Sequence, residues 1–446
     1  MVRTTYIQTM KVALVNSRID KAGQNIRHHI EQILLHREEP FQQQGRTYEF
    51  FDVSGRLIHE ERVDKDIDAD VVIFLSRHSS TNPVPVLTVH VTGNFGSAEL
   101  GGSPRTLAPA APAMMQATLR ALARHCPEGY RVSYEVTHHG PTDLVHPSFF
   151  VEIGSTEKEW NDPVAGQAVA EAVLGATVIH AVPLIGFGGT HYAARETEIA
   201  LSSRGAFGHI AHTREVANLD EPMIRSMIEK SGAVAAYIDR KALDPPALDR
   251  LTGILDATPV LRLSESEITA MGHIPWEVYC SVRKMAEETV GGARCFIHAM
   301  EGEGVLARIE IDPVLFAETV KSNEPALVKG LDELPVTHIS TRDNRILPVF
   351  VTYEKDSSQI INALNTLCVK IIRSNEITTT ENDYLTIQKV RFDPKKARDL
   401  GVMPGPVYKK LASGQAIEQD GRVITPDMVA SVHEIKVHIP GLEKFK

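Results

Sequence analysis

The stretch KVALVNSRIDKAGQNIRHHIEQIL, residues 11–34, decides the fold class of this chain. Its first six residues form a short apolar run, which is typical of a buried strand. Asp20 then stands where its side chain can cap a helix. After it, Ile26, Ile30 and Leu34 recur at helical spacing and predict one apolar face. A strand followed by a capped amphipathic helix is the basic unit of an α/β protein.

The same alternation of strand and helix patterns continues to about residue 202. We expect strands at 47–53, 70–76, 86–92, 131–137, 149–154 and 180–186. We expect helices at 110–125, after Asp162 and at 190–202. This order predicts a mostly parallel sheet flanked by helices.

The regular alternation ends near Trp276, and the remainder has mixed α and β patterns. With 446 residues and 43% hydrophobic residues, the chain is typical of a globular protein of two or three domains. We expect an N-terminal extension at 1–9, an α/β domain at 10–285 and a smaller α+β domain at 286–446. The sequence has no apolar run near the ~18 residues of a membrane helix and no apolar signal core, so we expect a cytoplasmic protein with no membrane partner.

Charge and residue usage narrow the kind of site. The net charge of −10 gives no general basic field for nucleic acid, and the four cysteines form no C-x-x-C pair. Eight of the 19 histidines fall between His78 and His191. Either composition drifts along the chain, or the first domain contains a histidine-lined site.

Several familiar catalytic motifs are absent from the sequence. It contains no G-x-S-x-G, no H-E-x-x-H and no P-loop. Gly186-Phe-Gly-Gly-Thr-His191 begins like a dinucleotide-binding fingerprint, but its final glycine is missing. We therefore expect neither an α/β-hydrolase, a zincin, a P-loop enzyme nor a protein with a dinucleotide cofactor.

Polar residues instead follow or interrupt the apolar strands. His78 follows one strand, and His90 lies in the next, just before Gly93 and Asn94. Ligands of open parallel sheets bind at the carboxyl ends of the strands, so these residues are candidates for a site. The alternatives are a simple polar turn at His78 and a hydrogen-bonded core histidine at His90.

His138 and His139 end a further strand, just before a Gly-Pro turn. Neighbouring strand residues face opposite sides, so only one of these imidazoles should enter a given site unless the chain bends. Glu152 lies within an otherwise apolar strand and needs a cation, a metal or several hydrogen bonds, unless its face is solvated.

The last motif is the glycine turn before His191. We expect a helix to open at Thr190, with His191, Tyr192 and Arg195 near its start. Free backbone N–H groups at a helix start can bind a phosphate or a developing oxyanion.

Together these motifs resemble the D-aminoacyl-tRNA deacylases of the archaeal and plant type. The resemblance covers roughly residues 10–285 and rests on several motifs in the same order. It implies an α/β domain related to peptidyl-tRNA hydrolases and nucleoside phosphorylases. It also implies a zinc-dependent enzyme that hydrolyses the ester between a D-amino acid and tRNA.

Such an ester needs an activated water and oxyanion stabilisation, supplied by a histidine base or by zinc. No spacing assigns three residues to one ion, but we expect His90, His138 and His191 to converge on a metal. Glu152 would ligate the metal or orient an imidazole, and His139 is the other candidate for catalysis. The expected substrate-binding residues, some as oxyanion donors, are His78, Gly93, Asn94, Gly189, Tyr192 and Arg195.

Within the C-terminal part, residues 401–414 and 420–426 resemble a short segment of tRNase Z enzymes. Lys409 and Lys410 follow its Pro-Gly-Pro turn, and we expect them to contact tRNA phosphates, unless they are merely solvated. We expect the protein to be a monomer. Two other functions stay open at this point. One is a phosphate-dependent transferase resembling nucleoside phosphorylases, and the other is a non-catalytic tRNA-binding module.

Overall fold

The computed structural model describes residues 9–36, 42–43, 45–301, 304–419 and 421–445. The chain divides into two compact units, Met1–Gly272 and His273–Lys446. The sequence pattern had placed the boundary after residue 285, but helix α9 (Trp276–Thr289) contacts β14 (Arg294–Ile297) of the second unit. The expected N-terminal extension lies outside the described residues, apart from Thr9.

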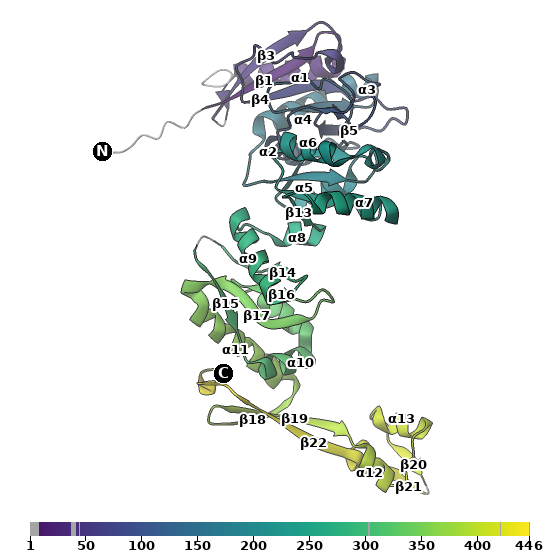
Figure 1. The fold of residues 1–446 in the computed structure, drawn as a ribbon, viewed down its shortest axis with the longest axis vertical. Coiled ribbons are helices and arrows are strands. Elements are labelled where there is room, and N and C mark those ends of the chain that lie inside the picture. The colour runs from purple at the N-terminus through teal and green to yellow at the C-terminus, as the bar shows by residue number, and fades with distance from the viewer. Residues whose placement is uncertain (1–8, 37–41, 44, 302–303, 420, 446) are drawn as a thin grey trace, which may run out of the picture. The chain divides into compact units, whose positions relative to one another are not determined.

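The first unit contains a seven-stranded sheet in the order β2-β3-β1-β4-β9-β5-β8 (Figure 1). Strands β3, β1, β4 and β9 are parallel to one another, whereas β5 pairs with β9 in antiparallel orientation. The sheet is therefore mixed, because β5 runs antiparallel to β9 and β2 runs antiparallel to β3, whereas β8 pairs with β5 in parallel orientation. Its strands are β1 (Met10–Ser17), β2 (Gln42–Gln43), β3 (Arg46–Val53), β4 (Val71–Arg77), β5 (Val86–His90), β8 (Arg131–Tyr134) and β9 (Ser148–Gly154).

A second sheet of the same unit has four parallel strands in the order β11-β10-β12-β13. The prediction of one sheet was thus wrong, since the strand expected at 180–186 belongs to this second sheet. A chain pattern shows where strands lie but not which strands pair. The strands are β10 (Val182–Phe187), β11 (Gly205–Ala211), β12 (Ala235–Ile238) and β13 (Leu261–Leu263).

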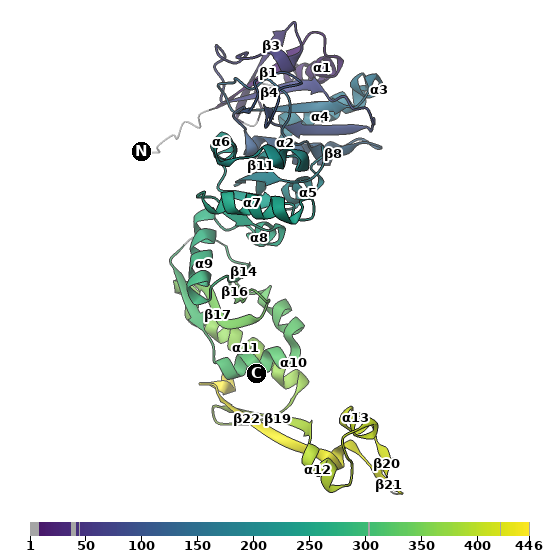
Figure 2. The same ribbon diagram turned by 45° about the vertical axis from the view of Figure 1, so that its right-hand side comes forward.

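Helices cover one face of the seven-stranded sheet and join the two sheets (Figure 2). Helix α1 (Lys21–Leu35) packs on β4 and on α4 (Pro163–Gly175), and α2 (Pro112–His125) contacts both β5 and β11. The predicted caps are confirmed: Asp20 accepts a hydrogen bond from the Gly23 amide, and Asp162 accepts one from the Val164 amide. The unit also contains β6 (Gly93–Asn94), β7 (Thr106–Leu107), α3 (Glu157–Trp160), α5 (Ala194–Ser202), α6 (Glu221–Ser231), α7 (Pro245–Asp256) and α8 (Glu265–Ala270).

Among the described residues, loops and a short 3-10 helix (Leu57–His59) cover the opposite face of the seven-stranded sheet. Val15, Phe74 and Phe150 of three neighbouring strands pack there against Leu57 and Leu144. This packing leaves the carboxyl ends of β1 and β4 open beside the loops, which is the edge where ligands bind in such sheets.

The second unit is an α+β structure with its own core. One antiparallel sheet has the order β14-β16-β17-β15 and another the order β18-β19-β22. The apolar stripe predicted around Ile360 and Leu364 lies on α11 (Ser357–Asn375). No helix in the described parts of the chain is long and apolar enough to cross a membrane. The other elements are β15 (Leu306–Glu310), α10 (Pro313–Leu331), β16 (Thr337–Ser340), β17 (Ile346–Tyr353), β18 (Ile377–Glu381), β19 (Tyr384–Phe392), α12 (Pro394–Asp399), α13 (Pro406–Ala412), β20 (Ile417–Gln419), β21 (Arg422–Ile424) and β22 (Ala430–His438).

Glu196 is a buried carboxyl group of the first unit that lies outside the cluster of polar residues described below. Glu196 on α5 is fully buried, and neither of its carboxyl oxygens is hydrogen-bonded. Burial, with a smaller effect of Asp239, raises the pKa of Glu196 to about 8. The side chain is therefore mainly protonated in the folded protein at neutral pH.

We expect Glu196→Gln to stabilise the protein at high pH and to change little at pH 5. Between the ordinary glutamate pKa and about 8, the folded state binds a proton that the unfolded state has lost, so stability falls as pH rises. Glutamine cannot ionise, and each unit of pKa difference corresponds to about 1.4 kcal/mol. The measurement is the melting temperature of both proteins at pH 5, 7 and 9. If the melting temperatures of the two proteins change with pH in the same way, Glu196 ionises at its ordinary pKa.

Candidate active site

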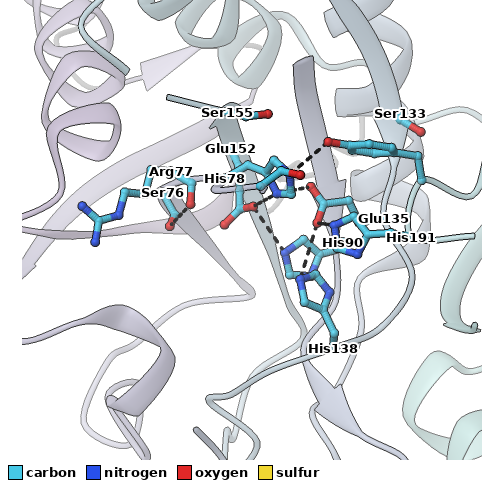
Figure 3. Close-up of polar contacts among 12 residues, drawn as sticks. Ser76, Arg77, His78, His90, Ser133, Glu135, His138, Glu152, Ser155 and His191 are labelled. Carbon is cyan, nitrogen blue, oxygen red and sulfur yellow. Dashed lines mark hydrogen bonds and ion pairs between the residues drawn. The ribbon is translucent and has the colours of Figure 1, made fainter. Parts of the chain in front are cut away.

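Seven side chains with metal-binding or proton-accepting atoms converge in the first unit, and all of them except His139 are labelled in Figure 3. They come from segments that are far apart in the sequence but meet around β4, β5 and β9. Five are imidazoles and two are carboxylates. They are His78, His90, Glu135, His138, His139, Glu152 and His191.

Strand register places two of the histidines beside Glu152. Glu152 of β9 lies opposite Ser76 of β4 and Thr88 of β5. Residues two apart on a strand share a face, so His78 and His90 project on the same side as Glu152. Their nearest imidazole nitrogens each lie 3.7 Å from Glu152 Oε2. Only glycine fits at 154, because a Cβ there would lie 2.7 Å from the His78 ring.

The chain bends at the two adjacent histidines. β8 ends at Tyr134, and His139 has a φ of 49°, in the left-handed region. The centroids of the His138 and His139 rings lie 4.5 and 4.8 Å from that of His90. The exception allowed for in the sequence analysis therefore applies: the chain has left the strand and bends here, so both imidazoles lie next to His90.

Glu135 is a central residue that the sequence analysis missed. It is buried, with Oε1 3.0 Å from His78 Nδ1 and Oε2 2.9 Å from His191 Nε2 and 3.5 Å from His138 Nε2. An isolated antiparallel bridge between Glu135 and Tyr192 brings His191 alongside. The sequence did contain a signal for Glu135, because a glutamate at the end of a partly buried strand needs a polar partner, as Glu152 does.

The carboxylates and imidazoles of the cluster shift one another's pKa values. Burial alone would raise the pKa of Glu135, but His191 and His78 outweigh it and hold that pKa well below its usual range. Burial would lower the pKa of His78, yet Glu135 and Glu152 raise it to about 11. Burial lowers the pKa of His139 to about 4, aided by His90. His138 shifts the same way, through burial and then the adjacent His139.

The residues present fit a metal ion. The Nε2 atom of His90 and both carboxylate oxygens of Glu135 are buried and lack hydrogen bonds, although other donors and acceptors lie close. Imidazole and carboxylate ligands suit zinc. Three overlapping groups have all their ligand atoms within 4.8 Å: His90, His138 and His139; His78, Glu135 and His191; and His90, Glu135 and Glu152.

The predicted metal trio is not one of these groups. His90 and His138 lie together, but among the described residues His191 groups with His78 and Glu135 instead. The reason is the bridge to Tyr192, which turns His191 toward Glu135.

The cluster lies between two cavities of about 450 and 390 Å³. His138, His139 and His191 line both of them. Arg77 and Trp160 form a wall of the larger cavity, with the guanidinium 5.0 Å from the indole centre. Two cavities that share one wall of imidazoles can hold the two ends of an elongated molecule.

Tyr192 reaches the cluster, but Arg195 does not. The Tyr192 hydroxyl lies 3.0 Å from His78 Nε2. Arg195 is exposed and pairs with Glu198 at 3.3 Å and Glu265 at 3.8 Å. The predicted helix start at Thr190 was wrong, because α5 begins at Ala194 and turns Arg195 away.

Two of the expected oxyanion donors are already used within the protein. The Gly93 amide donates to the His139 carbonyl, and the Asn94 side-chain amide donates to the Gly101 and Ser103 carbonyls. Gly189, with a φ of 87°, accepts a hydrogen bond from the Thr213 hydroxyl through its carbonyl. Lys409 and Lys410 lie on α13 of the second unit.

The chain is similar to proteins of one family. A sequence model described as D-aminoacyl-tRNA deacylase matches residues 65–260, which include the whole cluster. A D-aminoacyl-tRNA deacylase of Methanoregula boonei is 65% identical over 98% of this chain and 100% of its own length. Another, from Methanosarcina mazei, is 35% identical over 59% of this chain and 95% of its own length.

A solved structure is also similar to this chain. A crystal structure of a conserved protein of unknown function is 32% identical, with a TM-score of 0.54 over 59% of this chain and 98% of that one. With a relative so similar over nearly its whole length, the chain belongs to the D-aminoacyl-tRNA deacylase family.

Proposed function

We propose that the protein hydrolyses the ester bond of D-aminoacyl-tRNA at this cluster, releasing a free D-amino acid and tRNA. The observation that carries the proposal is the convergence of five imidazoles and two buried carboxylates within the segment that the family model matches. The predicted kinship of the first unit with peptidyl-tRNA hydrolases and nucleoside phosphorylases stays a prediction.

We assign different tasks to the residues of the cluster. Glu135 and Glu152 fix the orientation of the surrounding imidazoles. The low pKa values of His138 and His139 keep their rings neutral at pH 7, so a ring that does not hold a metal ion could accept a proton from the attacking water. The other cluster residues would position the ester carbonyl next to this water.

Zinc is the cofactor that we propose for this site. His90, His138 and His139 would hold an ion, or His78, Glu135 and His191 would. A zinc ion supplies Lewis acidity, which stabilises negative charge on a substrate oxygen.

The test of this function is hydrolysis of D-tyrosyl-tRNA and L-tyrosyl-tRNA by the purified protein. We expect rapid release of D-tyrosine, intact tRNA and little reaction with the L ester. An activity that requires inorganic phosphate and ignores the aminoacyl group would favour a phosphorylase-like transferase. Tight tRNA binding without turnover would favour a non-catalytic tRNA-binding module.

We also propose that Lys409 and Lys410 contact tRNA phosphates. Both are exposed at the end of α13. Lys389 of the same unit is a poorer candidate for such a contact, because it is half-buried and pairs with Glu318 at 2.5 Å. An acidic chain that binds a polyanion must rely on such local exposed cations.

The double variant Lys409→Ala, Lys410→Ala is expected to raise KM for aminoacyl-tRNA and leave kcat unchanged. Each lost phosphate contact should reduce the salt slope of binding by about one or slightly less. The control is Lys329→Ala with Lys370→Ala, two exposed lysines on α10 and α11 that give the same charge change. Equal KM values and salt slopes in both double variants would contradict the contact.

A further inference from the structure

Leu100 is an apolar side chain at the centre of a polar site. It is 54% exposed, and it lines both cavities together with His138, His139 and His191. Single exposed leucines are common on protein surfaces. This one stands beside the groups that would surround the ester carbonyl, where its bulk limits what can enter.

The backbone around Leu100 is firmly held. The Leu100 carbonyl accepts a hydrogen bond from the Gly140 amide, one residue from His139. Asn94 donates to the next carbonyl, that of Gly101, and the Ser103 amide donates to the Thr142 hydroxyl. The loop is therefore hydrogen-bonded directly to the histidine-bearing segment 138–142.

Close packing fixes this loop further. A Cβ on Gly140 would lie 2.4 Å from the Gly102 nitrogen and 2.7 Å from the Gly101 carbonyl carbon. Gly101 and Gly102 have φ values of 83° and 79°, in the left-handed region that favours glycine. Leu100 thus has a defined position relative to His138 and His139.

We propose that Leu100 is a steric gate that keeps the side chain of L-aminoacyl esters out of the productive position. The proposal rests on the proposed deacylase function and names the residue that determines its stereospecificity. With the ester and the amino group held in place, inversion at Cα exchanges the side chain with a hydrogen atom. A rigid group on one side of Cα then rejects one enantiomer by clash alone.

The test compares Leu100→Ala with the wild-type protein on D-tyrosyl-tRNA and L-tyrosyl-tRNA. We expect kcat/KM for the L ester to rise and kcat/KM for the D ester to stay nearly constant. The ratio of the two values, D over L, should then fall at least ~10-fold, which is within the range found for small steric changes in apolar pockets. Leu100→Met, which conserves volume, should retain the wild-type ratio. Ile19→Ala is the matched control, since Ile19 is 57% exposed and lines the larger cavity but not the smaller one.

An unchanged D/L ratio in Leu100→Ala would overturn the gate, as would an equal loss of both activities or the same fall in ratio for Ile19→Ala. Retained hydrolysis of the D ester shows that the variant is folded. A wild-type protein that does not hydrolyse D-tyrosyl-tRNA would contradict the proposed function itself. If the wild-type protein does hydrolyse it, the results above test the role of Leu100 alone.

Discussion

Replacing Glu135 by glutamine is expected to lower kcat/KM for D-tyrosyl-tRNA by about 10²–10⁴-fold, the range for loss of a group that acts on proton transfer. The carboxylate lies within 3.5 Å of nitrogen atoms of His78, His138 and His191, so it touches both sides of the cluster. Glutamine has nearly the same shape but cannot carry the negative charge that orients these imidazoles. The measurement is single-turnover deacylation of D-tyrosyl-tRNA.

Glu196→Gln is the matched control for this experiment. Glu196 is also a buried glutamate whose two oxygens lack hydrogen bonds, but its pKa of about 8 leaves it mainly neutral at pH 7. It lines neither of the two cavities beside the cluster. We expect full activity from Glu196→Gln at pH 7. Similar losses in both variants would mean that the effect of Glu135→Gln reflects packing and not the charge of the cluster.

Alanine at His138 and alanine at His139 are each expected to reduce kcat by more than about 10²-fold. The alternation of side chains along a strand alone predicted unequal losses of kcat, with a large loss for only one of the two variants. The structure revises this expectation, because the bend at His139 brings both rings within 5 Å of His90. The comparison of kcat for the two single variants is the measurement.

His146→Ala serves as the control for these two variants. His146 lies a few residues further along the chain and contacts Asp64 at 3.2 Å, away from the cluster. It should retain wild-type kcat. If only one of His138→Ala and His139→Ala is impaired, the second ring is a structural neighbour and the original alternation argument gives the right result.

The sequence predicted local structure well because the relevant signals are local. The helical spacing of Ile26, Ile30 and Leu34 and the cap at Asp20 appear in α1 as expected. Strand pairing is not a local property. For example, β5 pairs with β9 in antiparallel orientation, and β10 belongs to a separate sheet. Both features depend on contacts between distant segments, which no single sequence pattern specifies.

The site was predictable in composition but not in arrangement. The polar residues at strand ends pointed to His78, His90, His138, Glu152 and His191, all of which lie in the cluster. The contacts between these side chains depend on the left-handed backbone conformation of His139 and on the β-bridge between Glu135 and Tyr192. Neither feature has a sequence signature of its own.

The central claim is that the histidine–glutamate cluster is a metal-dependent hydrolytic site. The most direct test measures bound zinc and D-tyrosyl-tRNA hydrolysis in the same samples of wild-type protein and Glu135→Gln, before and after dialysis against a chelator and after zinc is restored. We predict that wild-type activity disappears with the zinc and returns with it, and that Glu135→Gln binds less zinc. A wild-type preparation free of zinc and other metals that retains full activity would contradict the claim and leave a histidine base as the catalyst.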